Sequence, residues 1–260
     1  MRRTATPDSV QEIRFLAIKN KIPTKLNEAF KEKSAVLIQG QLNTQSWQLE
    51  DNRLNALRQK IIGQHPTLKE VYGSPWRGIV TGFNEAFVIN RIQRDALIAE
   101  DPCSAELLKP LLEGKDLKKW HIESRDLWLI FTRRGVDIEK YQAIKKYLLQ
   151  FKYKLEPKPS DFQGVWEGRK SGSYEWFNIQ DTIGYHEKFE SQKLVYTRFM
   201  DKPMFWLDSN ENYYLNNALN FVSGVGEFEL GLLNSCIFWF VIKDLASVMS
   251  GGFFQVHGHV

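Results

Sequence analysis

Apolar residues recur along the chain at two spacings, and these spacings distinguish predicted helices from predicted strands. A repeat every three or four residues indicates a helix with one buried face, whereas a short apolar and β-branched run indicates a strand. The helical repeat predicts helices over residues 9–18, 26–33, 51–62, 93–100, 104–108, 137–151 and 227–248. The strand pattern predicts strands over residues 35–39, 127–131, 193–197, 204–207, 212–215, 219–222 and 253–256.

The segment 78–89 has the pattern of a β-hairpin. Two glycines, Gly78 and Gly82, bracket three β-forming residues, and a second apolar run follows the polar break at residues 83–85. Glycine tolerates the unusual backbone angles of tight turns, so strand, turn and strand are predicted here. Thr81, Gly82 and Asn84 are expected to shape the turn and pin the sheet rather than to contact DNA bases.

The predicted elements divide the chain into two regions, residues 1–70 and residues 71–260. The first region is expected to be a mostly helical lead-in, and the second mixes strands with helices in a mixed α/β (α+β) fold. A length of 260 residues suits one large domain or two small ones. The polar segment 163–180, which contains three glycines, is expected to be a long loop that ends in a strand.

Positive charge is concentrated in the middle third of the chain. The whole sequence has a formal net charge of +4 and a pI near 8.9, but residues 115–170 contain 14 Lys and Arg against 8 Asp and Glu. A basic surplus of this kind permits nucleic acid as a partner. The alternative is an ordinary solvated helix face, and composition alone does not choose between them.

Cysteine content and hydropathy indicate a cytoplasmic protein without a membrane span. Cys103 and Cys236 do not form a CxxC pair, so neither a disulfide framework nor a zinc ribbon is expected. The basic N-terminus lacks the apolar core of a signal peptide. The most apolar segment, residues 230–245, contains Lys243 and Asp244 and therefore is expected to form a buried helix rather than a membrane span.

Catalytic motifs are absent from the sequence, so no catalytic and no metal-binding residue is assigned. There is no phosphate-binding glycine loop, no HExxH, no GxSxG and no Pro-Pro pair of the kind that adenine amino-methylation requires. His257 and His259 alternate as two metal ligands on a strand would, but no carboxylate or cysteine accompanies them. A nuclease would cluster acidic residues with a lysine around a divalent metal. Only Asp161, Glu167 and Lys170 suggest this, at the wrong spacing for paired strands.

The segment 168–174 combines groups that bind nucleic acid. It contains two cations and two hydroxyls between flexible glycines, with aromatic residues on either side. Cations neutralise phosphates, hydroxyls hydrogen-bond to base edges, and arginine can pair with guanine through two bonds. A mobile surface loop without a ligand is the alternative interpretation.

Five motifs, taken in order along the chain, resemble one known family. Over about residues 70–260 the chain is similar to the TaqI-like specificity domain. This domain is the C-terminal target-recognition region of Eco57I-type adenine-N6 DNA methyltransferases and type IIG restriction-modification enzymes. The motifs are Arg77-Gly78-Ile79-x-Thr81-Gly82-x-Asn84-x-Ala86-Phe87, Leu107-x-x-Pro110-x-Leu112-x-Gly114-x-Asp116, Trp176-Phe177-x-Ile179-Gln180, Gln192-Lys193-Leu194-Val195-Tyr196 and Gly231-Leu232-Leu233-Asn234-Ser235.

The resemblance implies a recognition domain akin to type I restriction specificity subunits, which reads double-stranded DNA. In that family a methyltransferase domain, which uses S-adenosylmethionine, lies upstream. Residues 1–70 would then be a linker from that domain, and residues 71–260 a recognition domain shortened at its C-terminus. No cofactor is expected in this chain, and its expected partners are DNA and a methyltransferase or endonuclease domain. Whether the parent enzyme cleaves DNA or only methylates it stays open.

The leading hypothesis is therefore a non-catalytic DNA-recognition domain. The runner-up is a protein-interaction or structural module with the same fold that does not bind DNA. The helix predicted near residues 230–248 is expected to be a core helix, with docking on a partner as the alternative. Base or groove contacts are expected from Arg169, Lys170, Ser173, Tyr174 and Arg198, phosphate contacts from Arg133 and Arg134, and weaker ones from Lys145, Lys146 and Lys152. Trp128, Trp176, Trp206, Phe238, Trp239 and Phe240 are assigned to the core.

Overall fold

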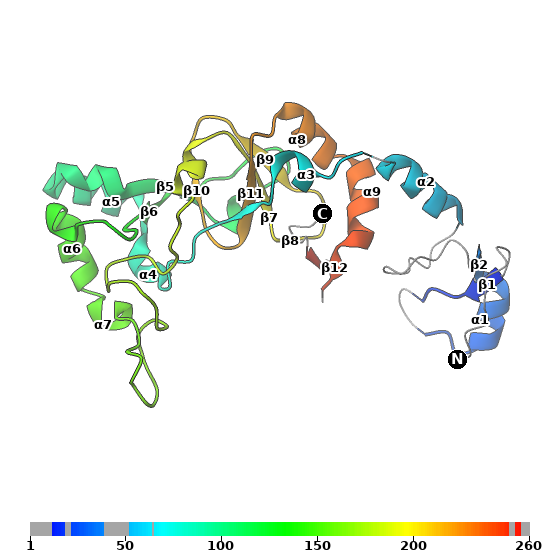
Figure 1. Cartoon of the computed structure of the whole chain (residues 1–260), viewed down its shortest axis with the longest axis horizontal. Coiled ribbons are helices and arrows are strands. Elements are labelled where there is room, and N and C mark those ends of the chain that lie inside the picture. The colour runs from blue at the N-terminus through cyan, green and yellow to red at the C-terminus, as the bar shows by residue number, and fades with distance from the viewer. Residues whose placement is uncertain (1–11, 19–21, 39–51, 64, 250–252, 256–260) are drawn as a thin grey trace. The chain divides into compact units, whose positions relative to one another are not determined.

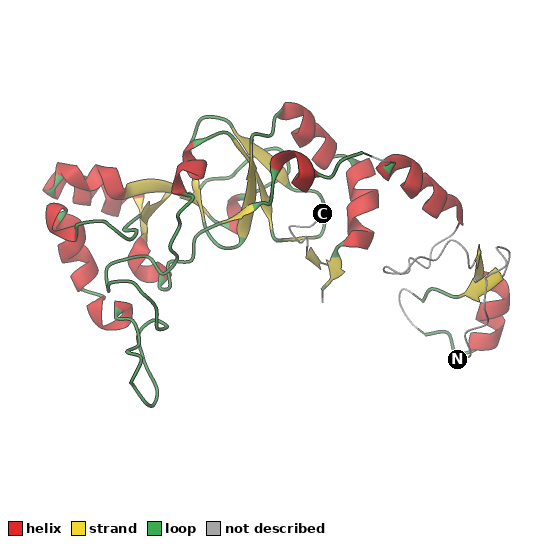
Figure 2. Ribbon diagram, in the orientation of Figure 1, coloured by secondary structure: helices red, strands yellow, loops and turns green. Residues whose placement is uncertain are grey.

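The computed structural model describes residues 12–18, 22–38, 52–63, 65–249 and 253–255, and these residues fall into two units (Figure 1). One unit spans Met1–Pro66 and the other Thr67–Val260. The fold is mixed α/β, with short helices around several small sheets (Figure 2). Within the described residues, no helix combines the length and apolar character needed to cross a membrane.

The first unit contains a two-stranded sheet as well as helices. Strand β1 (Glu12–Phe15) pairs antiparallel with β2 (Ala35–Ile38), and helix α1 (Leu26–Lys33) connects them. The helix predicted over 9–18 is therefore wrong across β1. The reason is that apolar and polar residues alternate in the sequence of β1, and pairing with β2 uses that period of two. Helix α2 (Asn52–Ile62) follows as predicted, although Asp51, the first residue of the predicted helix, lies outside the described residues.

The described residues of the second unit form three sheets. The first, in the order β10-β5-β6-β4, is antiparallel except for the parallel β10–β5 pair. The second, in the order β3-β11-β7-β9, is antiparallel throughout. The strands are β3 (Trp76–Arg77), β4 (Val88–Asn90), β5 (Leu108–Leu112), β6 (Leu127–Ile130), β7 (Lys193–Thr197), β9 (Phe205–Asp208), β10 (Tyr214–Leu215) and β11 (Leu219–Ser223), and the third sheet consists of β8 (Phe199–Met200), β12 (Ser247–Val248) and β13 (Phe254–Gln255).

Helices cover these sheets. The predicted helix over 137–151 is divided into two short segments, and a third helical turn follows it at Lys152–Leu155. The helix predicted over 93–100 begins earlier, after an Asn90–Gln93 capping box. The helical segments of this unit are α3 (Leu68–Tyr72), α4 (Asn84–Phe87), α5 (Arg91–Glu100), η2 (Pro102–Leu107), η3 (Gly114–Asp116), η4 (Ile138–Lys140), α6 (Gln142–Leu149), α7 (Lys152–Leu155), η5 (His186–Glu190), α8 (Glu227–Leu233) and α9 (Cys236–Leu245).

The sheet that contains β7 separates two hydrophobic cores. Alternate residues of a strand point to opposite faces, so Val195 joins the larger core with Phe221, while Leu194 and Tyr196 join the smaller one. The smaller core also contains Leu233 from α8 and Ile242 from α9, together with Met200 and Val225. Of the aromatic residues assigned to the core, Trp206 is buried, and Trp128, Trp176, Phe238 and Trp239 pack partly buried against the two cores.

The predicted helix over 227–248 is interrupted after Leu233. Asn234 is buried there, and its side-chain amide accepts from the backbone N–H of Phe205 and donates to the Phe205 carbonyl (3.2 and 2.9 Å). The hydroxyl of Ser235 then accepts from the backbone N–H of Phe238 (3.1 Å) and begins α9 as its N-cap. A tertiary contact and a cap thus divide one periodic pattern into two helices.

The predicted hairpin over 78–89 is wrong. Residues 84–87 form the helical turn α4 instead of a β-turn, and the Thr81 hydroxyl donates to the Asn84 side chain (2.6 Å). The first apolar run pairs elsewhere, because the backbone N–H of Ile79 donates to the Leu215 carbonyl (2.7 Å). Only the second run forms the expected strand, β4, and it pairs with β6. The hairpin turn that Thr81, Gly82 and Asn84 were expected to shape is therefore absent, and Thr81 instead bonds to the first residue of α4.

We expect Gly78→Ala to lower the free energy of unfolding by about 3 kcal/mol, because the new methyl group has no room. A Cβ at this position would lie 1.9 Å from the carbonyl oxygen of Asn216, a backbone atom that cannot turn away. Gly231→Ala in α8 is the matched control, since no atom lies within 4 Å of its Cβ position. The control should be neutral or stabilise by about 0.5–1 kcal/mol. Urea denaturation measures both, and equal effects would contradict the packing argument.

Candidate nucleic-acid interface

Arg169, a predicted base contact, is buried at 4% exposure. Its guanidinium donates to five backbone carbonyls, which belong to Leu155, Thr81, Asn178, Glu175 and Trp176, at 2.6 to 3.3 Å. Burial lowers the pKa of Arg169 to about 10. In this arrangement the guanidinium holds the loop together and does not face the solvent.

Arg134, a predicted phosphate contact, binds the next carbonyls of the same loop. Its guanidinium donates to the carbonyls of Ile179 (2.9 Å), Gln180 (2.7 Å) and Asp181, and to that of Ser173 at 3.3 Å. Burial lowers the pKa of Arg134 as well. Two arginines therefore bind almost every carbonyl between residues 173 and 181.

Tyr174 lies between the two guanidinium groups. The centre of its ring is 4.6 Å from the Arg169 guanidinium carbon and 5.2 Å from that of Arg134, and its hydroxyl donates to the Lys170 carbonyl. Burial raises the pKa of Tyr174, although the two cations oppose that rise. Its ring is thus used internally, for cation–π contacts.

The loop has no strand at its end, which corrects that part of the sequence interpretation. Side-chain donors replace a strand ladder: the Asn178 amide donates to the carbonyls of Thr132 and Arg133 (3.3 and 3.2 Å). Lys170 and Ser173 are exposed on the loop surface. Contact between these two side chains and DNA stays a prediction.

Arg133 is exposed at the edge of a cleft of about 390 Å³ below β5 and β6. Its guanidinium donates to the Arg134 carbonyl (3.2 Å). Acidic and basic groups are mixed in this cleft, where Lys109 pairs with Glu190 at 3.1 Å. The cleft therefore offers no uniformly positive surface, and the predicted phosphate contact of Arg133 stays a prediction.

The three helix lysines that the sequence singles out are paired with acidic neighbours. Lys145 is 2.6 Å from Glu139, Lys146 is 2.7 Å from Glu100, and Lys152 is 3.9 Å from Glu156. Exposed pairs of this kind contribute little energy. They match the alternative interpretation, a solvated helix face.

Arg198 lies beside a second, shallower groove of about 410 Å³. Its backbone N–H donates to the Ala218 carbonyl (3.0 Å), and its guanidinium carbon is 5.5 Å from the ring centre of the exposed Phe199. The groove is lined by Glu113, Gly114, Lys115, Thr197, Phe199, Met204, Asn216 and Ala218. We call it the Lys115 groove.

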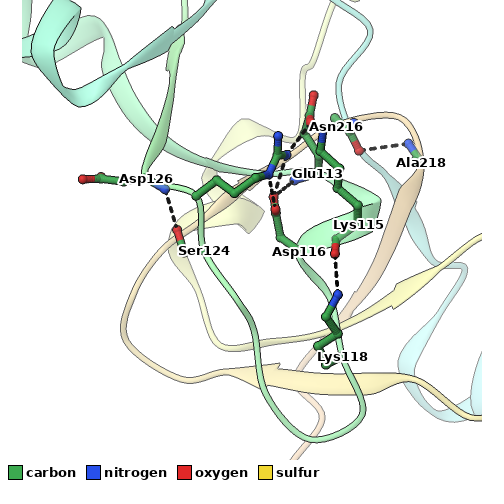
Figure 3. Close-up of polar contacts among 9 residues, drawn as sticks. Glu113, Lys115, Asp116, Lys118, Ser124, Asp126, Asn216 and Ala218 are labelled. Carbon is green, nitrogen blue, oxygen red and sulfur yellow. Dashed lines mark hydrogen bonds and ion pairs between the residues drawn. The ribbon is translucent and has the colours of Figure 1, made fainter.

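A buried carboxylate fixes one wall of the Lys115 groove (Figure 3). Asp116 is 2% exposed, accepts from the backbone N–H of Glu113 (2.8 Å) and forms an ion pair with Arg125, whose Nε is 2.6 Å away. Arg125 also pairs with the Glu113 carboxylate. The ammonium of Lys118 donates to the Lys115 carbonyl (2.8 Å). These contacts hold the turn that presents Lys115 and Lys118 at the edge of the groove.

Lys115 lines the groove, and further cations lie near its lining residues in the chain without strong pairing. Lys115 and Lys118 lie 3.5 and 3.4 Å from Glu113 and Glu123, and both pairs are partly solvated. In the described part of the chain, neither Lys119 nor Arg198 forms an ion pair. The sequence interpretation included Arg198 but missed the three lysines. The sequence does contain a pattern that points to these lysines, because three lysines within residues 115–119 are followed directly by Trp120.

The structure offers no assembled metal site among the residues it describes. No three His, Cys, Asp or Glu side chains there gather as metal ligands would, and His257 and His259 lie outside that part. Asp161, Glu167 and Lys170 are exposed on the loop that follows α7. Cys103 and Cys236 are free thiols.

Comparison with known proteins assigns the chain to a family. No curated protein matches the sequence. A solved structure described as the type IIL restriction-modification enzyme MmeI in complex with DNA is similar, with a TM-score of 0.48 and 11% identity, over 71% of this chain and 23% of that one. The family model of the TaqI-like C-terminal specificity domain matches residues 109–259, which is more than half of the chain. The protein therefore belongs to the family of TaqI-like C-terminal specificity domains.

Proposed function

We propose that this chain recognises a sequence in double-stranded DNA and that the Lys115 groove is the surface it uses. The observation that carries this proposal is the position of the groove: its lining residues from Glu113 to Ala218 all lie in the segment that matches the specificity-domain family. Lys115 lines it and Arg198 lies in the chain between its lining residues Thr197 and Phe199, and such cations bind the phosphates of duplex DNA.

The groove has groups for both parts of DNA recognition. Lys115, Lys119 and Arg198 would neutralise phosphates and orient the duplex, while the side-chain amide of Asn216 in the groove would bind base edges. The loop residues Lys170 and Ser173 would extend the contact if the duplex reaches them. Arg169, Arg134 and Tyr174 act from inside, by keeping that loop in place.

The chemistry would come from another part of a larger enzyme. The chain spans 23% of the similar restriction-modification structure. We propose that a methyltransferase domain, with S-adenosylmethionine as its cofactor, acts with this domain in a cytoplasmic type IIG restriction-modification enzyme. In that enzyme this chain selects the DNA site and carries out no chemistry itself.

Salt-dependent DNA binding tests the proposal. Fluorescence anisotropy of a labelled mixed-sequence duplex should give an affinity that falls about a hundredfold between 50 and 200 mM salt if four phosphates are contacted. Lys119→Ala and Arg198→Ala should each weaken binding and lower the salt slope by about one, because each removes one phosphate contact. Lys146→Ala in α6 is the control, because the Lys146 ammonium already pairs with Glu100 at the end of α5.

A folded chain that does not bind the duplex even at low salt would contradict the proposal. That result would favour the alternative, a protein-interaction module. Exposed apolar side chains on α8 and α9 are compatible with such a module, because Phe228 is 78%, Leu232 47% and Ile237 51% exposed. An unchanged salt slope in both groove variants, with binding retained, would place the DNA elsewhere on the surface.

A further inference from the structure

Trp120 occupies a backbone conformation that tryptophan rarely adopts. Its φ is +76°, and among the described residues it is the one aromatic residue with a positive φ. The residue is the third of the four-residue turn 118–121, which is closed by a hydrogen bond from the Lys118 N–H to the His121 carbonyl (2.9 Å). A positive φ at this position of a turn is ordinarily supplied by glycine or asparagine. A bulky residue here is strained, and such strain concentrates at functional sites.

The turn is held firmly although Trp120 itself is exposed. Leu117 pairs with Ile122 across the turn, and the N–H of Trp120 donates to the Phe205 carbonyl at 3.2 Å. Below it, the Glu123 N–H donates to the carbonyl of Asp116, the residue that Arg125 binds. We call residues 117–122 the Trp120 turn. The turn follows the groove residue Lys115 in the chain, and Phe205, which Trp120 contacts, follows the groove residue Met204.

The indole ring is available to a ligand. Trp120 is 48% exposed, and no other aromatic ring of the described residues stacks on it. The Lys119 ammonium lies 5.7 Å from the ring centre, and the neighbouring Lys118 ammonium donates to the Lys115 carbonyl. His121 and Glu123 are the remaining charged or titratable neighbours, 3.8 Å apart. An exposed aromatic face among lysines is the arrangement that stacks on bases and attracts phosphates.

We propose that Trp120 stacks on a nucleobase face exposed in duplex DNA, at an unstacked base step or beside a displaced base. The inference rests on the proposed function and adds to it that the bound duplex is locally opened. Apolar wedges that partly unstack duplex steps work in this way in other DNA-binding proteins. The firm turn fixes the ring before binding, so little freedom is lost when a base stacks on it.

Trp120→Gly is the most informative variant, because glycine adopts a positive φ without strain. The variant should keep the thermal midpoint of the wild-type chain. It should nevertheless bind the labelled mixed-sequence duplex about tenfold more weakly, since base stacking on an aromatic side chain is lost. The salt slope should not change, because no phosphate contact is removed. Trp120→Phe should retain most of the affinity, and Phe228→Ala on α8 is the control for an exposed aromatic residue elsewhere.

A duplex with one abasic site gives a readout that a purely structural residue would not change. Wild-type chain should bind it more tightly than the intact duplex, because the gap is already open, and Trp120→Gly should lose this preference. Equal binding of Trp120→Gly and wild type to both duplexes would overturn the stacking role while leaving the proposed function standing. No binding of either duplex by wild type at low salt would overturn the proposed function, and the stacking role with it.

Discussion

Replacing Arg169 by methionine is expected to lower the free energy of unfolding by about 4 kcal/mol and to release the loop of residues 155–181. Methionine resembles the arginine stem in size but offers no donor, so five buried or half-buried carbonyls lose their partner. Leaving buried acceptors unpaired is one of the few mechanisms that produce such large losses. Arg169→Lys should retain only part of the stability that Arg169→Met loses, because a single ammonium cannot reach all five carbonyls.

Urea denaturation measures the loss, and limited chymotrypsin digestion measures the release of the loop. Chymotrypsin suits the comparison because its sites at Phe162 and Trp166 are the same in every variant. Lys170→Met is the matched control: the neighbouring side chain is exposed, and its loss should change stability by less than about 0.5 kcal/mol. Equal stability and equal digestion of the two methionine variants would contradict the internal role of Arg169.

Breaking the buried ion pair between Lys193 and Asp208 is expected to have an effect of similar size. The Lys193 ammonium is 2.6 Å from the Asp208 carboxylate, and both side chains are at most 1% exposed. The carboxylate also accepts from the backbone N–H groups of residues 211, 212 and 213, and the ammonium donates to the Phe189 carbonyl. Asp208→Leu should therefore cost about 5 kcal/mol, because it strands a buried cation and three donors.

A double-mutant cycle separates the pair from its surroundings. Lys193→Met should cost about 3 kcal/mol, less than the change at Asp208, because the carboxylate keeps its backbone donors. The double variant should be about 2 kcal/mol more stable than the two single losses added together. The exposed pair of Lys146 and Glu100 serves as the control cycle, with a coupling below about 1 kcal/mol. A coupling of that small size for the buried pair would contradict the argument.

Local sequence patterns predicted several elements well because their causes are local. The strands β6, β7 and β11 follow from short β-branched and aromatic runs, and α1 follows from its helical repeat. The same reasoning failed where a distant partner decides the structure. Thr81 and its neighbours do not form a hairpin, because Leu215 and the 180–181 segment provide the hydrogen bonds instead.

The predicted site shows the same division. The resemblance to the TaqI-like specificity domain was confirmed by the family match over residues 109–259, although the first of the five motifs, at residues 77–87, lies outside the matched segment. The individual DNA contacts were not derivable in the same way, because a cation in a glycine-rich segment can point outward or inward. Arg198 and Lys170 are exposed, whereas Arg169 and Arg134 bind carbonyls far away in the chain.

The sequence by itself determined the family, the mixed α/β class and the presence of most strands and helices, because composition, periodicity and motif order are properties of the chain. Only the tertiary structure decided which cations are free. An arginine that binds five carbonyls and an arginine exposed to solvent cannot be told apart in the sequence. They differ because one is buried against segments up to 88 residues away in the chain. The same holds for Trp120, whose φ is set by closure of the turn against Phe205.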